Sequence, residues 1–436
     1  MRKKMASKPV SSKKISSVKR YKFEKYAKRF KQQTAKAQYK SAIKQANLAL
    51  KIVPNHMQVM ADLAFCLLMD EQYPAAYKTY KHIFHSGELG HQQAGDTWLD
   101  GLAEVCGWLD KTEELQRCGC LSLRKSDAEV CDVKQLAAHH LDQPTINCNL
   151  QKPRPQFKDQ AASRHIISFS LFGDLPKYCE GAVINAQVAK ELFPDWTCRF
   201  YIAQDVPLDV HHRLIDLGAQ VVIIDAQASA IHPLLWRFLV LDDQEVDYYM
   251  IRDADSLLSE KEQAAIEQWV ASDYWFHHMR DYFTHTELLL AGMWAGARGS
   301  LAKITPLIED YCQNYKSSER YIDQYFLKQF VWPQAKGSLL SHDQIFKFHN
   351  AQPFPKHLPL RWRDCLFHIG SNCSYQKLVV KVPQATLKVQ SWQLLDNANK
   401  EVCRNTSTVK NKQMSLSLPF VYVQQIQRNN WRISLI

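Results

Sequence analysis

The sequence of 436 residues lacks the glycine-rich fingerprints of the most common nucleotide-binding folds. Neither GxGxxG nor GxxxxGK[ST] occurs in it, which excludes the usual dinucleotide-binding and P-loop interpretations. The sequence also has no apolar run of the roughly 18 residues that a membrane-spanning helix needs. The basic residues near the N-terminus are not followed by an apolar stretch, so we expect no secretory signal.

The twelve cysteines form no CxxC pair and no regular framework. The closest two, Cys118 and Cys120, are too near each other for ordinary zinc spacing. We therefore expect reduced thiols in a cytoplasmic protein, because disulfides are rare in that compartment.

Acidic residues are almost absent from the N-terminal forty positions, which hold fifteen Lys and Arg but only Glu24 as an acid. The other residues contain 40 basic and 43 acidic side chains, although the whole chain has a net charge of +11. This distribution indicates a basic tail on a nearly neutral body and excludes a basic nucleic-acid-binding domain. We predict a disordered tail at residues 1–20 and a weak contact of the basic segment with anionic lipid at the inner face of the membrane. The alternative is a solubilising terminus.

Residues 21–141 have a helical pattern with an internal repeat. Tyr39–Ala42 recurs as Tyr73–Ala76, which is 34 residues later. That period is typical of tetratricopeptide helix pairs, so we predict tetratricopeptide-like repeats that bind a protein partner or the acceptor of a reaction. A plain helical bundle is the alternative.

Residues 142–164 contain several prolines among polar residues and are predicted to be a linker. Residues 165–375 then alternate between strand and helix patterns, which predicts a mostly parallel α/β sheet with helices on both faces. The predicted strands are 166–171, 197–203, 220–224, 248–251 and 274–278, and the predicted helices are 178–193, 208–217, 233–241, 260–271 and 321–332. Residues 376–436 are predicted to form a small β-rich appendage.

The stretch with the clearest chemistry is Tyr248–Ser256, because two aspartates follow a buried apolar strand. If the strand continues, Asp253 and Asp255 point to the same side. Two carboxylates at the carboxyl end of a strand suit Mg²⁺ or Mn²⁺, which could bridge the phosphates of a nucleotide. A solvated turn is the alternative.

Three later segments add candidate groups. Asp281 lies between Arg280 and His285, and the small residues around Met293 suit a loop where a ring-shaped substrate approaches the backbone. A core turn is the alternative for that loop. A helix opening with Asp323 and a late His-x-Gly at His368 follow.

These features, in this order, resemble the glycosyltransferases of the GT-A fold over residues 165–375. A repeat region in front of such a domain also resembles bacterial surface-polysaccharide enzymes. The resemblance implies a nucleotide-sugar donor and a DxD motif at Asp253 and Asp255 that binds Mn²⁺ or Mg²⁺. It implies a further metal ligand at His368, although Ser371-Asn372-Cys373 replaces the Lys-Pro-Trp that follows in the family. A satisfied core or capping histidine is the alternative.

The chemistry of such an enzyme assigns the other candidates. Ser168, Ser170 and Asp205 are predicted to hold the base and ribose, and Gly292, Met293 and Trp294 to line the donor site. Arg237 and Arg252 are predicted to meet the diphosphate, because Arg favours bidentate phosphate contacts. Asp281 is the candidate base that deprotonates the acceptor hydroxyl in an inverting reaction. A retaining enzyme would need no such base.

The sequence therefore predicts a metal-dependent glycosyltransferase that moves a sugar to a glycan or lipid-linked acceptor. One alternative is an interaction scaffold with an inactive glycosyltransferase-like domain. The other is a nucleotidyltransferase, which would need a glycine-rich basic loop after its first strand. Residues 172–177 supply one glycine and one lysine there.

Overall fold

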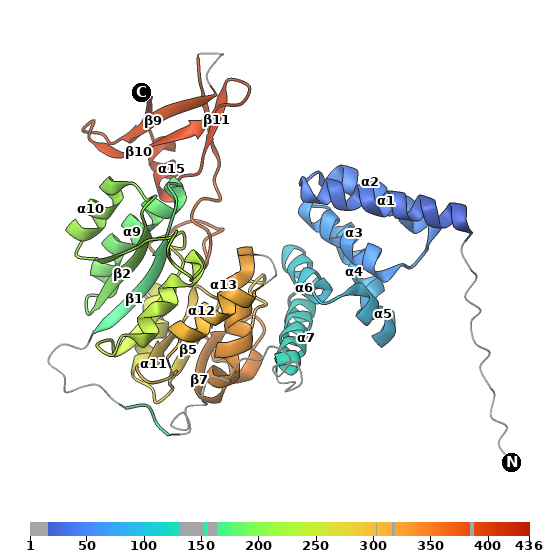
Figure 1. The fold of residues 1–436 in the computed structure, drawn as a ribbon, viewed down its shortest axis with the longest axis horizontal. Helices are drawn as coiled ribbons and strands as arrows, with labels where there is room; N and C mark the ends of the chain where they lie inside the picture. The colour runs from blue at the N-terminus through green and yellow to red at the C-terminus, as the bar shows by residue number, and fades with distance from the viewer. Residues whose placement is uncertain (1–15, 131–151, 156–163, 302, 316–318, 384–387) are drawn as a thin grey trace. The chain divides into compact units, whose positions relative to one another are not determined.

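The computed structural model describes residues 16–130, 152–155, 164–301, 303–315, 319–383 and 388–436. The chain divides into two compact units, Met1–Ser122 and Leu123–Ile436 (Figure 1). The division falls inside a helix, α7, and so lies before the predicted boundary at residue 141. The rest of that boundary region lies outside the described residues.

The described part of the first unit is entirely helical. Its helices are α1 (Ser17–Ala35), α2 (Tyr39–Ile52), α3 (Met57–Met69), α4 (Tyr73–Phe84), α5 (Gly87–Ala94), α6 (Trp98–Trp108) and the start of α7 (Thr112–Val130). The hydroxyl of Ser16 accepts a hydrogen bond from the Lys19 N–H and caps α1. The predicted disordered tail is therefore wrong for residues 17–20, whereas residues 1–15 lie outside the described part.

The 34-residue period has a structural counterpart in the first unit. Helices α2 and α4 begin at the two matching tyrosines, Tyr39 and Tyr73. Their inward faces carry Ala42, Ala46 and Ala49 on α2 and Ala76, Tyr80 and Ile83 on α4, all buried in one core. Small residues on α2 allow close helix packing, and each of the first four helices packs against the next. A helical repeat region is confirmed, and its membership of the tetratricopeptide class stays a prediction.

A seven-stranded sheet forms the centre of the second unit. Its strands are β1 (His165–Leu171), β2 (Trp196–Ala203), β3 (Gln220–Ile224), β4 (Tyr248–Arg252), β5 (Phe276–Arg280), β6 (Met293–Ala297) and β7 (Leu339–Asp343). They lie in the order β3-β2-β1-β4-β6-β5-β7, and β6 alone is antiparallel to its neighbours. The predicted mostly parallel sheet is confirmed.

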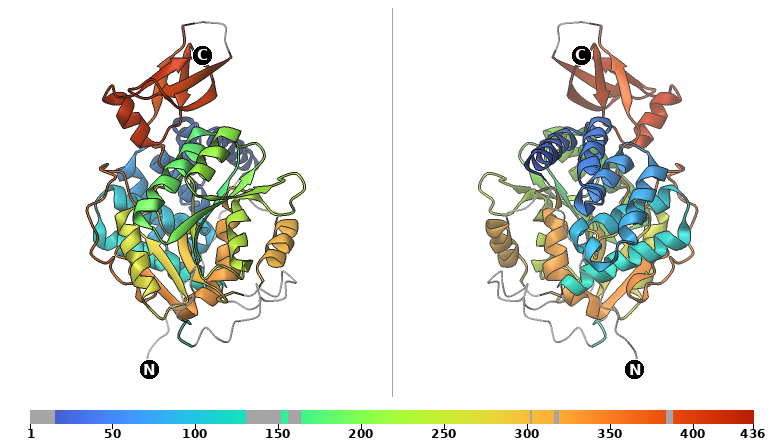
Figure 2. Two further views of the ribbon diagram at one scale, coloured as in Figure 1. Left: turned by 90° about the vertical axis from the view of Figure 1, so that its left-hand side faces the viewer. Right: turned by 90° about the vertical axis from the view of Figure 1, so that its right-hand side faces the viewer.

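Helices cover the two faces of this sheet, because the chain changes direction after β3. Helices α9 (Pro176–Leu192) and α10 (Leu208–Asp216) follow β1 and β2, whereas the 3-10 segment η2 (Pro233–Asp242) joins β3 to β4 (Figures 1 and 2). Right-handed crossovers in opposite directions put these connections on opposite faces. Further helices are α11 (Glu260–Val270), α12 (Thr305–Asn314), α13 (Ile322–Phe326), a π-helical continuation Leu327–Val331 and α14 (Trp332–Ala335).

The C-terminal residues form two small antiparallel sheets, as the predicted β-rich appendage requires. Strands β9 (Val389–Leu395), β10 (Glu401–Thr408) and β12 (Arg432–Leu435) form one sheet, and β8 (Leu378–Lys381) pairs with β11 (Gln413–Leu416). Helix α15 (Phe420–Gln427) was not expected from the sequence. Among the described helices, none has the length and apolar character that crossing a bilayer requires.

The described part of the predicted linker is bound to the second unit. Arg154 is 2% exposed, and its guanidinium donates hydrogen bonds to the carbonyls of Val270 (2.8 Å) and Ser272 (2.6 Å) at the end of α11. The Trp275 indole donates to the Lys152 carbonyl at 2.9 Å. Residues 152–155 therefore bind the C-terminal end of α11 and do not form a free linker.

Candidate functional site

The strand order of the large sheet reverses at β1. From β1 the chain runs outward through β2 and β3, and then returns to place β4 on the other side of β1. In open α/β sheets, ligands bind outside the carboxyl ends of the strands at such a reversal. Here those ends are Leu171 of β1 and Arg252 of β4. The predicted aspartate pair follows β4 directly and so lies at this switch point.

Asp253 and Asp255 lie in a tight turn and not on a continuing strand. Strand β4 ends at Arg252, and the Ser256 N–H donates to the Asp253 carbonyl at 3.1 Å. The two carboxylates have different cationic partners: Asp253 pairs with Arg237, and Asp255 pairs with Lys177. The predicted continuation of the strand through both residues is wrong, because the backbone turns after Arg252.

Helix α9 holds this turn in place through two residues one helical turn apart. A Cβ atom at Gly181 would collide with the Ala254 carbonyl, so only glycine lets the turn approach the helix this closely. The Asn185 amide donates to the Ser256 carbonyl at 2.8 Å, and its oxygen accepts from the Leu258 N–H at 3.0 Å. Sequence reasoning missed both positions. A polar Asn and a Gly four residues apart on an apolar helix face were the available signal.

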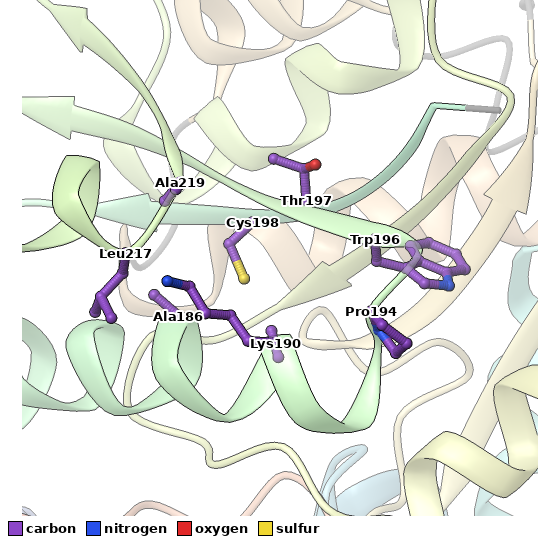
Figure 3. A pocket seen from close by; sticks show the side chains of 10 residues that line it. Ala186, Lys190, Pro194, Trp196, Thr197, Cys198, Leu217 and Ala219 are labelled. Atoms are coloured by element: carbon purple, nitrogen blue, oxygen red, sulfur yellow. The ribbon is translucent and has the colours of Figure 1, made fainter. Parts of the chain in front are cut away.

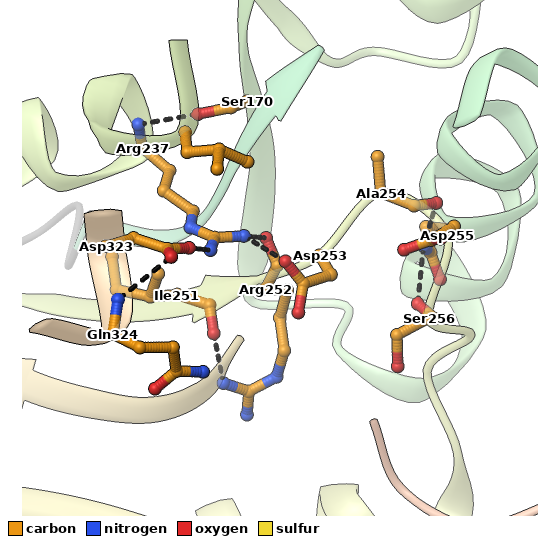
Figure 4. A network of polar contacts seen from close by, with 12 residues as sticks. Ser170, Arg237, Ile251, Arg252, Asp253, Ala254, Asp255, Ser256, Asp323 and Gln324 are labelled. Atoms are coloured by element: carbon orange, nitrogen blue, oxygen red, sulfur yellow. Dashed lines mark hydrogen bonds and ion pairs between the residues drawn. The ribbon is translucent and has the colours of Figure 1, made fainter. Parts of the chain in front are cut away.

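A buried guanidinium connects the turn to the opposite helix layer. Arg237 on η2 is 3% exposed and binds Asp253 and Asp323 with different nitrogens, the latter at 2.6 Å (Figure 4). It also donates to the Arg252 carbonyl at 3.2 Å. Burial raises the pKa of the Asp323 carboxyl, although Arg237 opposes that shift. Arg237 thus lies at the predicted site, with its charge already compensated by two carboxylates.

Ser168 and Ser170 position the backbone of Arg237. The Ser168 hydroxyl donates to the Arg237 carbonyl at 2.7 Å, and the Ser170 hydroxyl accepts from the Arg237 N–H at 3.0 Å (Figure 4 shows the second bond). Ser168 is completely buried, and Ser170 is 8% exposed. The predicted contact of Ser168 with a base or ribose is therefore wrong, because alternation directs both serines toward η2 rather than toward solvent.

The loop after β1 supplies a second cation. Lys177, in the first turn of α9, donates to the Asp255 carboxylate at 3.1 Å. Burial and the nearby charge of Asp253 raise the pKa of Asp255, and Lys177 opposes this. Asp205 accepts a hydrogen bond from the Gly173 N–H at 2.9 Å, which ties the end of β2 to the same loop. The role predicted for Asp205 toward a nucleotide stays a prediction.

Arg252 does not reach the switch point. Its side chain is 2% exposed and forms an ion pair with Glu262, which is equally buried. The guanidinium also donates to the Ile251 and Trp294 carbonyls at 2.7 and 3.0 Å. The predicted diphosphate contact of Arg252 is therefore wrong, because its strand position directs it into the protein.

The segment predicted as a substrate-facing loop is mainly strand β6. Met293 is 3% exposed, and Trp294 is completely buried against Phe238 and Tyr249. The roles predicted for Met293 and Trp294 toward a donor are therefore wrong, because both side chains are buried on an interior strand of the sheet. Gly292 does lie at the site: a Cβ there would overlap the Asp253 carboxylate.

Asp281 lies at the end of β5 with its carboxylate fixed by two donors. It forms an ion pair with Lys261 of α11 and accepts a hydrogen bond from the Ile369 N–H at 3.1 Å. The buried His285 ring accepts the Asp281 N–H at 3.0 Å and orients the turn. Of the neighbours predicted from sequence, His285 contacts Asp281, whereas the Arg280 guanidinium donates to the Glu287 and Leu288 carbonyls. The charge partner of Asp281 is Lys261, which was missed.

His368 lies beside this group. Its ring stacks on Tyr282 with centroids 3.8 Å apart, and Nδ1 is 3.0 Å from the Leu366 carbonyl. Donation from Nδ1 to that carbonyl leaves Nε2 as the acceptor nitrogen. Burial lowers the pKa of His368, and the hydrogen bond to the backbone and the charge of Asp281 oppose this.

Residues 368–373 connect the two groups of carboxylates. Ile369 donates to Asp281 at one end, and the Cys373 N–H donates to the Asp255 carbonyl at 2.7 Å at the other. Gly370 between them has φ of +82°, a conformation that favours glycine. The predicted His-x-Gly segment therefore runs along the carboxyl ends of the strands from Asp281 to the turn after β4.

The side chains predicted to hold a metal do not form one ligand cage. In the part of the chain that the structure describes, no three His, Cys, Asp or Glu side chains gather into a group that could hold an ion. His368 thus does not complete a three-ligand set with Asp253 and Asp255. A Mg²⁺ ion can nevertheless be held by one or two carboxylates when substrate phosphates and water complete its coordination. The aspartate pair has suitable oxygen chemistry for that mode.

A cavity of about 250 Å³ lies at the other end of the sheet (Figure 3). Trp196, Thr197 and Cys198 at the start of β2 line it, together with Ala186 and Lys190 of α9. It lies at the amino end of a parallel strand, away from the switch point. We therefore do not assign it to the candidate site.

Comparisons with known proteins do not assign a family. No protein-family model matches the sequence, and no curated protein matches it. Among solved structures, a mutant O-GlcNAc transferase from Thermobaculum terrenum is similar at 11% identity and a TM-score of 0.26. The match covers 54% of this chain and 47% of that chain, so this chain spans less than half of that structure. A likeness at that TM-score supports no conclusion about this chain.

Proposed function

We propose that the second unit is a nucleotide-sugar-dependent glycosyltransferase that transfers a sugar to a glycan or lipid-linked acceptor, with a role in surface polysaccharide synthesis. The observation that carries this proposal is the grouping of Asp253, Asp255, Asp323, Arg237 and Lys177 at the switch point between β1 and β4. Charged side chains of both signs outside the ends of parallel strands are suited to a ligand that carries phosphates.

In this proposal the cations and the carboxylates have separate tasks. Lys177 lies in the first turn of α9, where the helix dipole also favours an anion, and it would meet the donor diphosphate. Arg237 is buried and fixes Asp253 and Asp323, so it acts as a positioning residue. Asp253 and Asp255 would hold Mg²⁺ or Mn²⁺ together with the phosphates. A bound ion would neutralise charge that develops on the leaving diphosphate.

Asp281 is the proposed base for an inverting reaction. Lys261 and the Ile369 N–H hold its carboxylate in one orientation at the end of β5. A fixed carboxylate at the edge of the site can accept the proton of an acceptor hydroxyl. His285 and Tyr282 would keep that turn rigid.

A panel of nucleotide sugars tests the proposal. The full chain is incubated with each donor and Mg²⁺ or Mn²⁺, and release of the nucleotide is measured. We expect release from at least one donor and a loss of more than 100-fold in Asp255→Asn, on the order of 3 kcal/mol in transition-state stabilisation. Arg213→Met is the matched control, since Arg213 forms an ion pair with Glu180 on α9 and not with the switch-point residues.

The contradicting outcome has two parts. If no donor is turned over and none raises the melting temperature of the protein, the second unit does not bind nucleotide sugars. Donor binding without turnover would instead favour the alternative of an inactive glycosyltransferase-like domain on an interaction scaffold.

A further inference from the structure

A second cavity lies at the carboxyl end of the sheet, beside Asp281. Its volume is about 470 Å³, within the range of small-molecule sites. The lining residues are Lys261 of α11, Gln344 just after β7, and Phe354, Pro355, Lys356 and His357 of the following segment. None of the sequence-based assignments uses these residues.

Two independent contacts connect this cavity to Asp281. Lys261 lines the cavity and forms the ion pair with the Asp281 carboxylate. Phe354 also lines the cavity and belongs to one apolar cluster with Met279, Met293 and Ile369. The N–H of that same Ile369 donates to the second oxygen of Asp281. The cavity and the carboxylate therefore share their supporting residues.

The lining has basic and neutral polar groups but no acid. Lys356 and His357 are exposed, and Gln344 can donate or accept a hydrogen bond. The Lys261 ammonium lies 4.3 Å from the centroid of the Phe354 ring, which forms an apolar wall. Two acids at the ends of β5 and β7 have partners of their own: Asp281 pairs with the lining residue Lys261, and Asp343 accepts the Ile345 and Phe346 N–H groups. Such a lining favours a ligand that carries an oxyanion.

We propose that this cavity binds the acceptor of the reaction and that the acceptor is an acidic sugar, with a carboxylate or phosphate held by Lys356 and the Gln344 amide. The inference rests on the proposed function, since it is the neighbouring Asp281 that makes a sugar hydroxyl the reacting group. With the oxyanion held in the cavity, a hydroxyl of the same sugar can face the Asp281 carboxylate. A neutral sugar would lack this anchor.

Binding of simple sugars to the full chain, measured by saturation-transfer NMR without any donor, tests the inference. The probes are glucuronic acid, glucose 6-phosphate and glucose, which separate carboxylate, phosphate and neutral ligands. We expect at least one anionic probe to bind, with at least tenfold lower affinity for glucose. Lys356→Ala and Gln344→Ala should each weaken anion binding by about threefold to tenfold, as expected for loss of one hydrogen bond at an exposed site.

Lys190→Ala is the matched control, because Lys190 is an exposed lysine that lines the separate cavity at the amino end of β2. It should leave anion binding unchanged. Equal binding of glucose, no binding of either anion, or equal effects of Lys190→Ala and Lys356→Ala would each overturn the inference. The NMR experiment contains no donor, so its outcome is independent of the nucleotide-release assay. Turnover of a donor in that assay, together with no anion binding in the NMR experiment, would refute the acidic acceptor alone. Anion binding without turnover of any donor would refute the proposed glycosyltransferase.

Discussion

The two units differ in what they bury. In the described part of the first unit, the buried side chains are apolar apart from Ser122 at its last position, and small alanines allow its helices to approach closely. The second unit buries many charged side chains, among them Arg237, Arg252, Glu262 and Asp323. Burying a charge costs several kcal/mol unless it is paired and hydrogen-bonded.

This difference indicates where the chemistry lies. A charge-free core is sufficient for a stack of helices that presents a surface to a partner. Paired charges in a core are weak evidence for stability, because apolar residues of similar volume often replace them at no cost. The buried pair of Arg237 and Asp323 beside the turn after β4 therefore points to a function of the second unit.

Replacing the buried guanidinium should have the largest effect. Arg237→Met leaves Asp253 and Asp323 without their shared partner, which costs about 3–5 kcal/mol when a buried pair is broken. Urea unfolding measures that cost, and donor turnover per folded molecule should fall by more than 100-fold. Arg213→Met removes a bidentate pair with Glu180 and should lower stability while turnover remains. Equal losses of turnover in both variants would mean that these pairs are only structural.

Removing the metal or its ligands should have the next largest effect. Asp253→Asn and Asp255→Asn each take one carboxylate from the turn after β4, and both should lose Mn²⁺-stimulated donor turnover. The melting temperature should change little in Asp255→Asn, because Asn keeps the size of the side chain. Asp253→Asn should lower it, since the buried Arg237 then keeps Asp323 as its one carboxylate partner. Turnover is measured with increasing Mn²⁺ and with excess EDTA. Full activity in EDTA would contradict metal dependence but leave the rest of the proposed function standing.

The mostly parallel sheet of the second unit could be predicted from the sequence, because strands such as Ile166–Leu171 and Tyr248–Ile251 are short apolar runs between helical patterns. Strands β6 and β7 were not among the predicted strands. The directions of single side chains could not be predicted. A turn after Arg252 separates the two aspartates. The packing of β1 against η2 buries the Ser168 hydroxyl, which binds the Arg237 carbonyl. These outcomes depend on backbone geometry and on partners far away in the sequence.

Dependence on distant partners also explains why the sequence did not identify the cations of the candidate site correctly. Arg252 and Arg237 look alike in the sequence, yet one is bound to Glu262 and the other reaches Asp253. Lys177 and Lys261 stand in ordinary helical contexts, and only the fold shows that they face Asp255 and Asp281. A charge predicts that a partner is needed, whereas the identity of the partner requires the tertiary structure.

Removing the first unit should show whether it recruits the acceptor while the second unit turns over the donor. A chain of residues 112–436 keeps the whole of α7, whose Asp127 accepts a hydrogen bond from Trp332 at 2.7 Å within the second unit. We expect it to retain donor turnover and to lose most transfer to the native acceptor, as a recruiting role of the repeats requires. Transfer is compared with that of the full chain at equal turnover of the donor. Equal transfer by both chains would refute recruitment by the first unit.

The buried carboxyl group of Asp255 should make stability depend on pH. Because burial and Asp253 raise its pKa, its stabilising contribution is present below the unfolded value of about 3.9 and is lost as pH rises through the raised folded value. The free energy of unfolding should therefore fall more for the natural chain than for Asp255→Asn as pH rises from about 4 to 7. Urea unfolding at four pH values measures this. Parallel curves for the two proteins would contradict the shift.

The basic segment of the first unit should give the smallest effect, a weak contact with anionic lipid. Fifteen Lys and Arg lie within residues 1–40, and the described part of α1 carries its basic residues on an exposed helix. Each charge near an anionic surface contributes about 1 kcal/mol, and the attraction fades within a Debye length of about 8 Å at physiological salt. We therefore expect the full chain to sediment with phosphatidylserine vesicles at low salt and to be released at high salt.

Deletion of residues 1–15 tests this contact without removing α1, which begins at Ser17 and buries Phe30 in the core of the first unit. The deletion removes six of the basic side chains and should shift the sedimentation curve to higher lipid concentration. Neutral phosphatidylcholine vesicles are the control, because a charge-driven contact requires an anionic surface. If the full chain stays in the supernatant with anionic vesicles at low salt, the segment does not bind membranes, and the asymmetry between the two units lies in their cores alone.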